Sequence, residues 1–308
     1  MEVVCVRANY FFYIVGKNLK AVYKKPIKSL INAVFMGICT LTKQVLKCII
    51  GKNGVFLPLR IFISGYLQME KYIDMHCHIL PAVDDGSASL AQSVSMVKIA
   101  YEDGIRKIIA TPHYHIGRCI AEYDESEEAF RQLKEEIEKL GIDMELYIGS
   151  EIYFYSEAME KLEEGMIHTM NNGSCILLEY DPGSEYTRIV QGVNAAVIAG
   201  YVPIVAHVER YMCMVDRPER CEELVHQGAY LQVNASSVVG KSGKEIQKFI
   251  FKLMKKKLIS FVATDAHSDG HRRPVLSEAY MLVKKKFKEE YADRLFYGNP
   301  LKIIESKL

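Results

Sequence analysis

Histidine and carboxylate side chains recur in this sequence at the ends of short apolar runs. His76 and His78 stand at the end of one such run, Asp265 and His267 follow another, and other runs are followed by a single histidine or carboxylate. Imidazole together with carboxylate is a ligand set that favours Mn²⁺, Fe²⁺ or Zn²⁺ over Ca²⁺ or a structural zinc. The candidate ligands are His76, His78, Asp85, His113, Glu151, Glu179, His207, Asp265 and His267.

The spacing within these motifs suits a site with several metal ions. In an extended segment residues i and i+2 point the same way, so His76 and His78 are able to hold one ion, while Asp265 and His267 serve neighbouring ions. A carboxylate such as Glu151 is able to bridge two cations. Multinuclear clusters lower the pKa of water and stabilise the attacking and leaving oxygens of a displacement. The motifs therefore favour hydrolysis of a phosphate ester.

Each motif has an ordinary explanation when it is taken alone. A lone His-x-His is a weak signal, and Asp84-Asp85-Gly86 is typical of a tight turn. Glu179 could end a strand in solvent, and His207 could be a hydrogen-bonded core residue. Cys77 lies between two candidate ligands, but its side chain is expected to face the other way and to pack. The coincidence of such residues at the ends of six separate runs favours one shared site.

The composition excludes several other classes of protein. With 49% hydrophobic and 25% charged residues, the 308-residue chain is typical of a globular protein and not of a disordered one. Its net charge of +1 shows no basic bias of a nucleic-acid-binding protein. The eight cysteines form no C-x-x-C pair, and none has an arginine six positions later, which argues against a zinc knuckle and a cysteine-nucleophile phosphatase. A reducing cytoplasm is the expected compartment.

Strand and helix patterns alternate regularly from Lys71 onward. The segments predicted as strands are 72–76, 107–111, 145–148, 175–179, 203–207, 230–233 and 259–264. The segments predicted as helices are 89–103, 122–140, 184–199, 218–227, 243–257 and 274–290. The first of these helices opens with Ser89 and stops at Gly104, which are typical cap residues.

Buried-type strands that alternate with helices imply parallel strands joined by right-handed crossovers. Either an open doubly wound sheet or a closed barrel satisfies this pattern. In a barrel the carboxyl ends of all strands share one face, so the candidate ligands would meet there.

Residues 1–69 differ from the rest and are predicted to be an extension of the catalytic domain at 70–308. Ten lysines and arginines stand against two glutamates in residues 1–70, so this segment carries a net charge of +8 and the rest of the chain −7. It shows no clean helical or strand period, and its longest uncharged run, 29–42, is shorter than the roughly 20 residues of a spanning helix. Two interpretations stay open: an over-extended gene start before Met69, or a basic arm that contacts an anionic membrane surface.

The order of these motifs resembles the PHP (polymerase and histidinol phosphatase) superfamily, whose fold is a distorted (β/α)7 barrel of TIM type with a three-metal site. More closely, the segments 73–80, 83–86, 149–153 and 206–211 resemble the manganese-dependent tyrosine phosphatases of Gram-positive capsule and exopolysaccharide loci. The resemblance covers about residues 70–305. Glu179 is informative, because many PHP members place a histidine there and the capsule phosphatases a glutamate.

The resemblance implies three divalent ions, with Mn²⁺ expected and Fe²⁺ or Zn²⁺ as alternatives. The three implied ligand sets are His76, His78, Glu151 and Asp265; Glu151, Glu179 and His207; and Asp85, His113 and His267. Arg210 and Arg273 match the phosphate-binding arginines of these relatives. The segment 267–273 is one residue longer than in the relatives, so Arg272 is the alternative to Arg273.

The function implied by the resemblance is that of a cytoplasmic metal-dependent protein-tyrosine phosphatase. Its substrate would be the tyrosine-rich tail of a bacterial tyrosine kinase that controls polysaccharide export. A PHP phosphatase for a small ester such as histidinol phosphate is the first alternative, against which Glu179 and the segment 207–210 argue. A non-catalytic regulatory protein is disfavoured by the full ligand set, and a PHP exonuclease by the negative charge of the catalytic domain.

Overall fold

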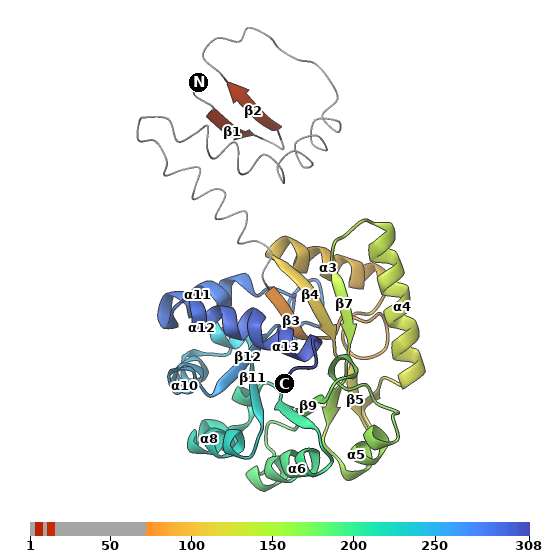
Figure 1. Ribbon diagram of the computed structural model, residues 1–308, viewed down its shortest axis with the longest axis vertical. Coiled ribbons are helices and arrows are strands. Elements are labelled where there is room, and N and C mark those ends of the chain that lie inside the picture. The colour runs from red at the N-terminus through yellow and green to blue at the C-terminus, as the bar shows by residue number, and fades with distance from the viewer. Residues whose placement is uncertain (1–3, 9–10, 16–71) are drawn as a thin grey trace. The chain divides into compact units, whose positions relative to one another are not determined.

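The computed structural model describes residues 4–8, 11–15 and 72–308 of the chain. The first two ranges are strands β1 (Val4–Ala8) and β2 (Phe11–Val15), which pair antiparallel (Figure 1). The sequence predicted no element there. The rest of the predicted extension, including the uncharged run and Met69, lies outside the described residues.

All seven predicted strands are present in the part of the chain that the structure describes, with bounds within two residues of those predicted. They are β3 (Tyr72–Cys77), β4 (Ile105–Ala110), β7 (Glu145–Ile148), β9 (Cys175–Glu179), β10 (Val202–Val205), β11 (Tyr230–Asn234) and β12 (Ile259–Ala263).

Three further strands were not predicted: β5 (His113–His115), β6 (Cys119–Ile120) and β8 (Glu151–Tyr153). β5 follows β4 after Thr111-Pro112, and β8 follows β7 after Gly149-Ser150. Proline has no N–H to donate to a ladder, which helps to explain the first interruption. Each interruption carries the chain from one sheet into another.

The strands of residues 72–308 form two sheets. The smaller has the order β3-β4-β7, and the larger has the order β12-β11-β10-β9-β8-β5-β6. All neighbours are parallel except β5 and β6. The end of β3 also meets the chain after β12, through a bridge between Cys77 and Ala266. The fold is therefore mixed α/β with parallel sheets, and no single closed sheet is found among the described residues.

Helices lie around the strands in residues 72–308 (Figure 1). The principal helices are α3 (Leu90–Asp103), α4 (Tyr123–Lys139), α5 (Ser156–Glu163), α6 (Tyr186–Ile198), α8 (Glu219–His226), α10 (Lys244–Lys255), α11 (Ser277–Phe287), α12 (Glu289–Asp293) and α13 (Asn299–Ile304). The predicted caps of α3 are confirmed, because the Ser89 hydroxyl accepts a 3.2 Å hydrogen bond from Gln92 N and Gly104 has φ 100°. The described helices include none with the length and apolar content needed to span a bilayer.

Strand side chains alternate between two apolar layers. The side chains that face inward form a smaller apolar cluster. The alternate side chains of the same strands, such as Ile108 and Leu178, pack with the helices in a larger apolar cluster. The inner cluster includes Met75, Ile109, Leu177, Ile204 and Phe261. These five residues come from strands of both sheets, so the two sheets enclose a common interior.

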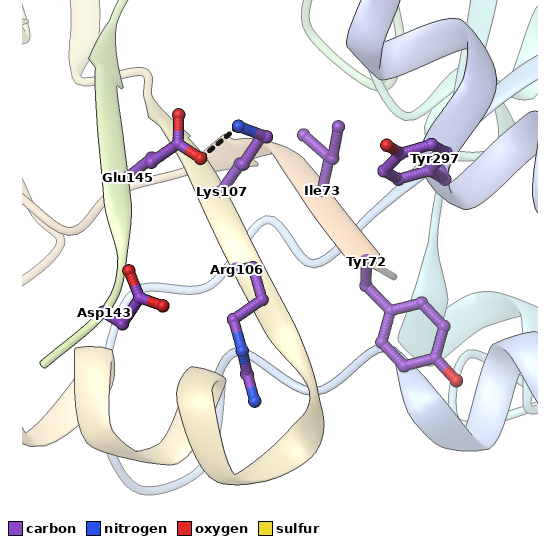
Figure 2. Close-up of a pocket in the computed structure, with 7 residues that line it drawn as sticks. All are labelled: Tyr72, Ile73, Arg106, Lys107, Asp143, Glu145 and Tyr297. Carbon is purple, nitrogen blue, oxygen red and sulfur yellow. Dashed lines mark hydrogen bonds and ion pairs between the residues drawn. The ribbon is translucent and has the colours of Figure 1, made fainter. Parts of the chain in front are cut away.

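A pocket of about 210 Å³ lies at the amino ends of β3, β4 and β7 (Figure 2). It is lined by Tyr72, Ile73, Arg106, Lys107, Asp143, Glu145 and Tyr297. Lys107 and Glu145 form an ion pair across it. The predicted ligands belong to the opposite, carboxyl ends of the strands, so this pocket is separate from the candidate site.

Candidate metal centre

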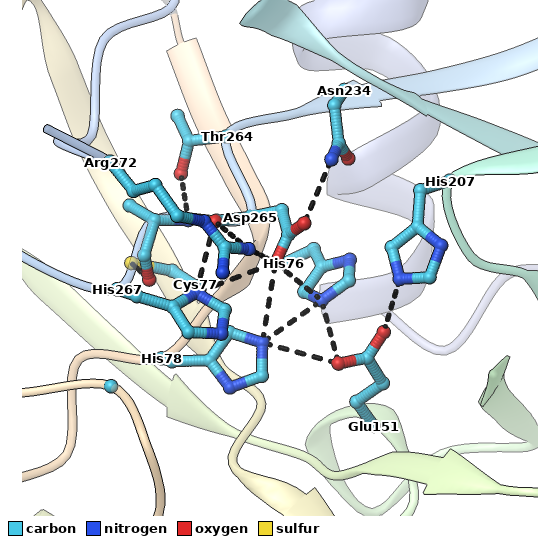
Figure 3. Close-up of polar contacts among 12 residues, drawn as sticks. His76, Cys77, His78, Glu151, His207, Asn234, Thr264, Asp265, His267 and Arg272 are labelled. Atoms are coloured by element: carbon cyan, nitrogen blue, oxygen red, sulfur yellow. Dashed lines mark hydrogen bonds and ion pairs between the residues drawn. The ribbon is translucent and has the colours of Figure 1, made fainter. Parts of the chain in front are cut away.

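The structure brings all nine predicted ligands together where the strands end. His76 lies in β3 with His78 and Asp85 just beyond it, His113 and Glu151 begin β5 and β8, Glu179 ends β9, His207 follows β10, and Asp265 and His267 follow β12. Figure 3 shows the inner part of this cluster, where the side chains of His76, His78, Glu151 and Asp265 converge. The interruptions before β5 and β8 help to build the cluster, because each new strand begins at a candidate ligand, His113 or Glu151.

The most deeply buried group joins His76, His78 and Glu151. The two histidine Nε2 atoms lie 3.2 Å apart, and each is 3.2 Å from Glu151 Oε2. Asp265 Oδ1 lies 3.6 and 3.5 Å from the same nitrogens. Within the described residues, Glu151 Oε2 is buried without a hydrogen-bond partner. Because an unsatisfied buried carboxylate oxygen is costly, this convergence fits a bound cation.

Glu151 also faces a second group, which contains Glu179, His207 and His113. His207 Nε2 lies 2.8 Å from Glu151 Oε1 and 3.5 Å from Glu179 Oε1. His113 Nδ1 lies 3.1 Å from Glu151 Oε2 and 3.3 Å from Glu179 Oε2. Glu151 is thus placed to bridge two cations.

Asp85 lies between His113 and His267 at the outer side of the cluster. Its Oδ1 is 3.4 Å from the Nε2 atom of each histidine. The family resemblance implied this group of three residues, and the structure brings them together with His78 nearby. His113 differs from the implied grouping, because its two ring nitrogens face two different groups.

The charges of the cluster also suit cation binding. Burial alone raises the pKa of the Glu151 carboxyl, but the imidazoles of His76 and His113 hold this pKa well below its usual value. Burial also raises the pKa of the Asp265 carboxyl, but His76, His78 and Arg210 outweigh it and keep this pKa well below its usual range. Both side chains are therefore ionised at neutral pH. Nitrogen and oxygen donors without thiolate fit Mn²⁺, Fe²⁺ or Zn²⁺, and such ions would balance these buried charges.

Asp84 orients His78, a role that the sequence analysis did not assign. Asp84 Oδ2 lies 2.7 Å from His78 Nδ1 and accepts a 3.0 Å hydrogen bond from His113 N. A proton on Nδ1 leaves the His78 Nε2 lone pair directed at the cluster. Gly86 makes this turn possible, because a Cβ there would lie 2.4 Å from the His78 carbonyl oxygen.

Strand β11 supplies none of the predicted ligands but positions three of them. Gln232 Oε1 accepts a 2.6 Å hydrogen bond from His207 N and lies 3.3 Å from His76 Nδ1. The Gln232 amide donates to Asn234 Oδ1 at 2.9 Å, and Asn234 Nδ2 donates to Asp265 Oδ2 at 2.8 Å. Sequence reasoning missed this chain of amides, although polar residues at i and i+2 inside an apolar strand were a usable signal.

Two ligands lie at unusual backbone positions. His207 has φ 30° and Asp265 has φ 52°, in the left-handed region that side chains other than glycine seldom adopt. Such conformations cost about 1–3 kcal/mol each and persist where the surroundings hold them. Here the hydrogen bond that His207 N donates to Gln232 Oε1, and the one that Asp265 N donates to the His76 carbonyl at 2.9 Å, hold them in place.

Two arginines reach the cluster. Arg210 Nη2 lies 2.6 Å from Asp265 Oδ2, and Arg272 Nη2 lies 2.8 Å from Asp265 Oδ1. Their side chains are 38% and 39% exposed, so both remain accessible to a ligand. Arg273, which the resemblance favoured, is exposed, and it is Arg272 that contacts the cluster.

A buried cluster of histidines and carboxylates at the carboxyl ends of parallel strands, bordered by two arginines, defines a metal-dependent hydrolase of the α/β class. Residues 72–305 match the model of the family described as "Capsular polysaccharide synthesis, CpsB/CapC". The chain belongs to this family, as its motifs predicted.

Named relatives agree with this assignment. The chain is 32% identical over 241 residues to the tyrosine-protein phosphatase CpsB of Streptococcus pneumoniae, across 77% of this chain and 99% of that protein. It is 36% identical over 219 residues to the tyrosine-protein phosphatase YwqE of Bacillus subtilis, across 71% and 86%.

Solved structures extend the comparison. A chain from crystal structures of YwqE and CpsB, described as unique metal-dependent tyrosine phosphatases, superposes with a TM-score of 0.73 at 33% identity and covers 77% of this chain and 95% of that chain. The histidinol phosphate phosphatase of Lactococcus lactis superposes with a TM-score of 0.52 at 14% identity, across 74% and 98%, which shows likeness of fold alone.

Proposed function

We propose that this protein is a divalent-metal-dependent protein-tyrosine phosphatase. The observation that carries the proposal is the convergence of nine candidate ligands, with Arg210 and Arg272 beside them. Relatives over most of the chain are named tyrosine-protein phosphatases. Histidinol phosphate is the less supported candidate substrate, because the similarity to its phosphatase extends only to the fold.

Three divalent ions, with Mn²⁺ as the expected metal, would be held by the three overlapping groups of ligands. His76, His78, Glu151 and Asp265 would hold the first, Glu151, Glu179 and His207 the second, and Asp85, His113 and His267 the third. When bound, such ions lower the pKa of water and neutralise phosphate charge.

The chain's own residues prepare the site for a phosphate group. Arg210 and Arg272 offer guanidinium groups that bind phosphate oxygens through paired N–H donors and stabilise charge in the transition state. In the described structure both contact Asp265, so a phosphate would share or replace that partner. Asp84 and Gln232 hold the histidine rings in fixed orientations.

The fold that supports this site is proposed to be a distorted (β/α)7 barrel. The inner apolar cluster draws side chains from both sheets, and the bridge between Cys77 and Ala266 joins the first of the seven strands to the last. Residues 70–308 would form this barrel as one domain, with residues 1–69 as an extension. The family match, which starts at residue 72, supports that boundary.

The proposed substrate is the phosphorylated tyrosine-rich tail of a bacterial tyrosine kinase that controls capsule or exopolysaccharide synthesis. The family description, which names capsular polysaccharide synthesis, supports this choice. Such an enzyme would act in the cytoplasm. If residues 1–69 are a translated basic arm and not an over-extended gene start, they would bring it to an anionic membrane surface.

The test is hydrolysis of a phosphotyrosyl peptide and of histidinol phosphate by chelated protein reloaded with Mn²⁺, Fe²⁺, Zn²⁺ or Mg²⁺. We expect hydrolysis of the peptide only with added metal, and elemental analysis near three ions per chain. The matched variants are His76→Ala, which removes a ligand, and His226→Ala, which removes an exposed histidine of α8. Preferential hydrolysis of histidinol phosphate, or full activity after exhaustive chelation, would refute the proposal.

A further inference from the structure

The face of the sheet that carries the ligands continues past them on three neighbouring strands. β5 pairs with β8 in a register that sets His113 beside Glu151, and β8 pairs with β9 so that Tyr153 lies beside Glu179. Residues i and i+2 of a strand share a face, so His115 lies on the ligand side of β5 and Tyr153 on that of β8. The residues next outward from His113 and Glu151 are therefore aromatic, while Asp181 stands two positions beyond Glu179.

Ring contacts join these side chains into one surface, the aromatic shelf, formed by His115, Tyr153 and Tyr155. The His115 ring centroid lies 4.0 Å from that of Tyr153 and 5.8 Å from that of Tyr155, and the two tyrosine centroids are 4.8 Å apart. The Tyr153 hydroxyl donates to Asp181. The alternate residues pack into the larger apolar cluster: Tyr114 and Ile152 within β5 and β8, and Phe154 and Tyr180 just after β8 and β9.

Arg188 of α6 borders the shelf with a positive charge. Its guanidinium carbon lies 5.6 Å from the Tyr153 ring centroid and 5.2 Å from that of Tyr155. Its Nη2 donates to Phe154 O at 2.9 Å, and its buried Nε has no hydrogen-bond partner within the described residues. The shelf thus combines ring faces with a cation, which suits an aromatic group attached to an anion.

The accessible side of the metal centre borders this shelf. The side chains of His113 and Glu179 are 15% and 16% exposed, whereas those of His76, His78 and Glu151 are fully buried. His115 and Tyr155 are only partly buried, so part of each ring is open to a ligand. A phosphate bound beside His113 and Glu179 would have its ester substituent next to the shelf.

We propose that the aromatic shelf is the subsite that binds the phenyl ring of phosphotyrosine and thereby makes the enzyme prefer aryl over alkyl phosphates. This inference rests on the proposed function, because it assigns a substrate to the same centre. Aromatic rings favour offset or edge-to-face contacts at about 4.5–7 Å between centroids, and a phosphoserine side chain has no ring to make them.

The test measures binding, so that it does not depend on turnover. Calorimetric titration of the manganese-loaded full chain compares benzylphosphonate with cyclohexylmethylphosphonate, which carry the same charged group and rings of similar size. We expect tighter binding of the aromatic ligand, and a fall in the ratio of the two affinities of about threefold to tenfold in Tyr155→Leu and His115→Ala. Tyr155→Phe keeps the ring and should keep the ratio, as should Tyr297→Ala, a control in the pocket at the opposite ends of the strands.

Kinetics give a second readout on a phosphotyrosyl peptide. Loss of a ring contact that is equal in the ground and transition states raises KM and leaves kcat nearly unchanged. If Tyr155→Leu does not fold, the substitution of the partly exposed His115 still decides the question.

An unchanged affinity ratio, or an equal loss of affinity for both phosphonates, would overturn the shelf as the ring subsite. Protein that prefers benzylphosphonate through these residues but hydrolyses no phosphotyrosyl peptide would overturn the proposed function and leave the subsite standing. The two failures are therefore distinguishable.

Discussion

Asp265 is a candidate metal ligand whose backbone and carboxylate are both held in place by neighbouring residues. Its backbone has φ 52°, and its carboxylate receives hydrogen bonds from Arg210 and Asn234 and forms an ion pair with Arg272. A carboxylate that is ionised, buried and fixed from several sides is a good metal ligand. It also keeps the two guanidinium groups close to the place where a phosphate would bind.

Arg210 and Arg272 are expected to stabilise the phosphate in the transition state and not to bind metal. Arg210→Ala and Arg272→Ala should each lower kcat on a phosphotyrosyl peptide by about a hundredfold, or about 3 kcal/mol, because each removes a charged donor in the transition state. Metal content, measured by elemental analysis, should not change. The control is Arg273→Ala, whose exposed side chain should be dispensable. A larger loss for Arg273 than for Arg272 would reverse this assignment.

Individual ligands were predictable because their motifs are local. His-x-His and Asp-x-His place two donors on one side of an extended segment whatever the rest of the chain does. The partners of those donors were not predictable, since Asp84 and Gln232 act through contacts that depend on the folded chain. The choice between Arg272 and Arg273 likewise depends on how the loop after β12 turns, and no periodicity encodes that turn.

At the scale of elements, the loop after β3 is fixed by a close approach of its backbone to His78. A Cβ at Gly86 would lie 2.5 Å from His78 Cβ and 2.8 Å from Asp84 Oδ1. Gly86→Ala should therefore displace the loop that carries Asp85, at a cost of about 1–3 kcal/mol in the free energy of unfolding. It should also weaken binding of one metal ion, seen as lower stoichiometry in elemental analysis.

The control for this loop is Gly183→Ala, since a Cβ at Gly183 would meet no atom within 4 Å. Gly183→Ala should leave stability and metal content unchanged. Equal stability and metal content in Gly86→Ala and Gly183→Ala would show that the loop after β3 adjusts to a Cβ and does not require glycine.

Gln232 of strand β11 is expected to support metal binding by orienting the ligands. Gln232→Leu keeps the size of the side chain but removes the acceptor for His207 N and the donor to Asn234. Loss of groups that orient ligands typically lowers metal affinity about 10- to 100-fold, so we expect that fall in competition with a chelator. Gln227→Leu, at an exposed position after α8, is the control. Unchanged affinity in Gln232→Leu would make β11 a packing strand only.

The periodic elements were predictable, but their interruptions were not. Strands β9 and β12 are largely apolar runs, whose pattern can be recognised without information from distant segments. β5 and β8 are three residues long, and they form because β8 pairs with β5 on one side and with β9 on the other. Such short strands have too little pattern of their own, and their register depends on segments far away in the sequence.

At the scale of the whole molecule, the catalytic part of the chain is predicted to be independent of the extension. A chain beginning at Met69 should fold, bind metal and hydrolyse phosphotyrosyl peptide as fast as the full chain, because β3 begins at Tyr72 and all nine candidate ligands lie beyond it. Circular dichroism and kinetics on both chains check this. An insoluble or inactive shorter chain would place residues 1–68 inside the domain.

Metal binding should also stabilise the whole fold, because ligands from both sheets meet at one cluster. Chelated protein keeps Glu151 Oε2 buried without a hydrogen-bond partner among the described residues, whereas the unfolded chain exposes this carboxylate to water. One site at a free-ion concentration 100 times its Kd adds about 2.7 kcal/mol. For a domain of this size that amounts to a rise in Tm of about 5–10 °C. Calorimetric scans in Mn²⁺ and in EDTA measure the difference, which should shrink in His76→Ala and persist in His226→Ala. An identical Tm in both solutions would mean that the cluster binds no ion tightly enough to act as a metal centre.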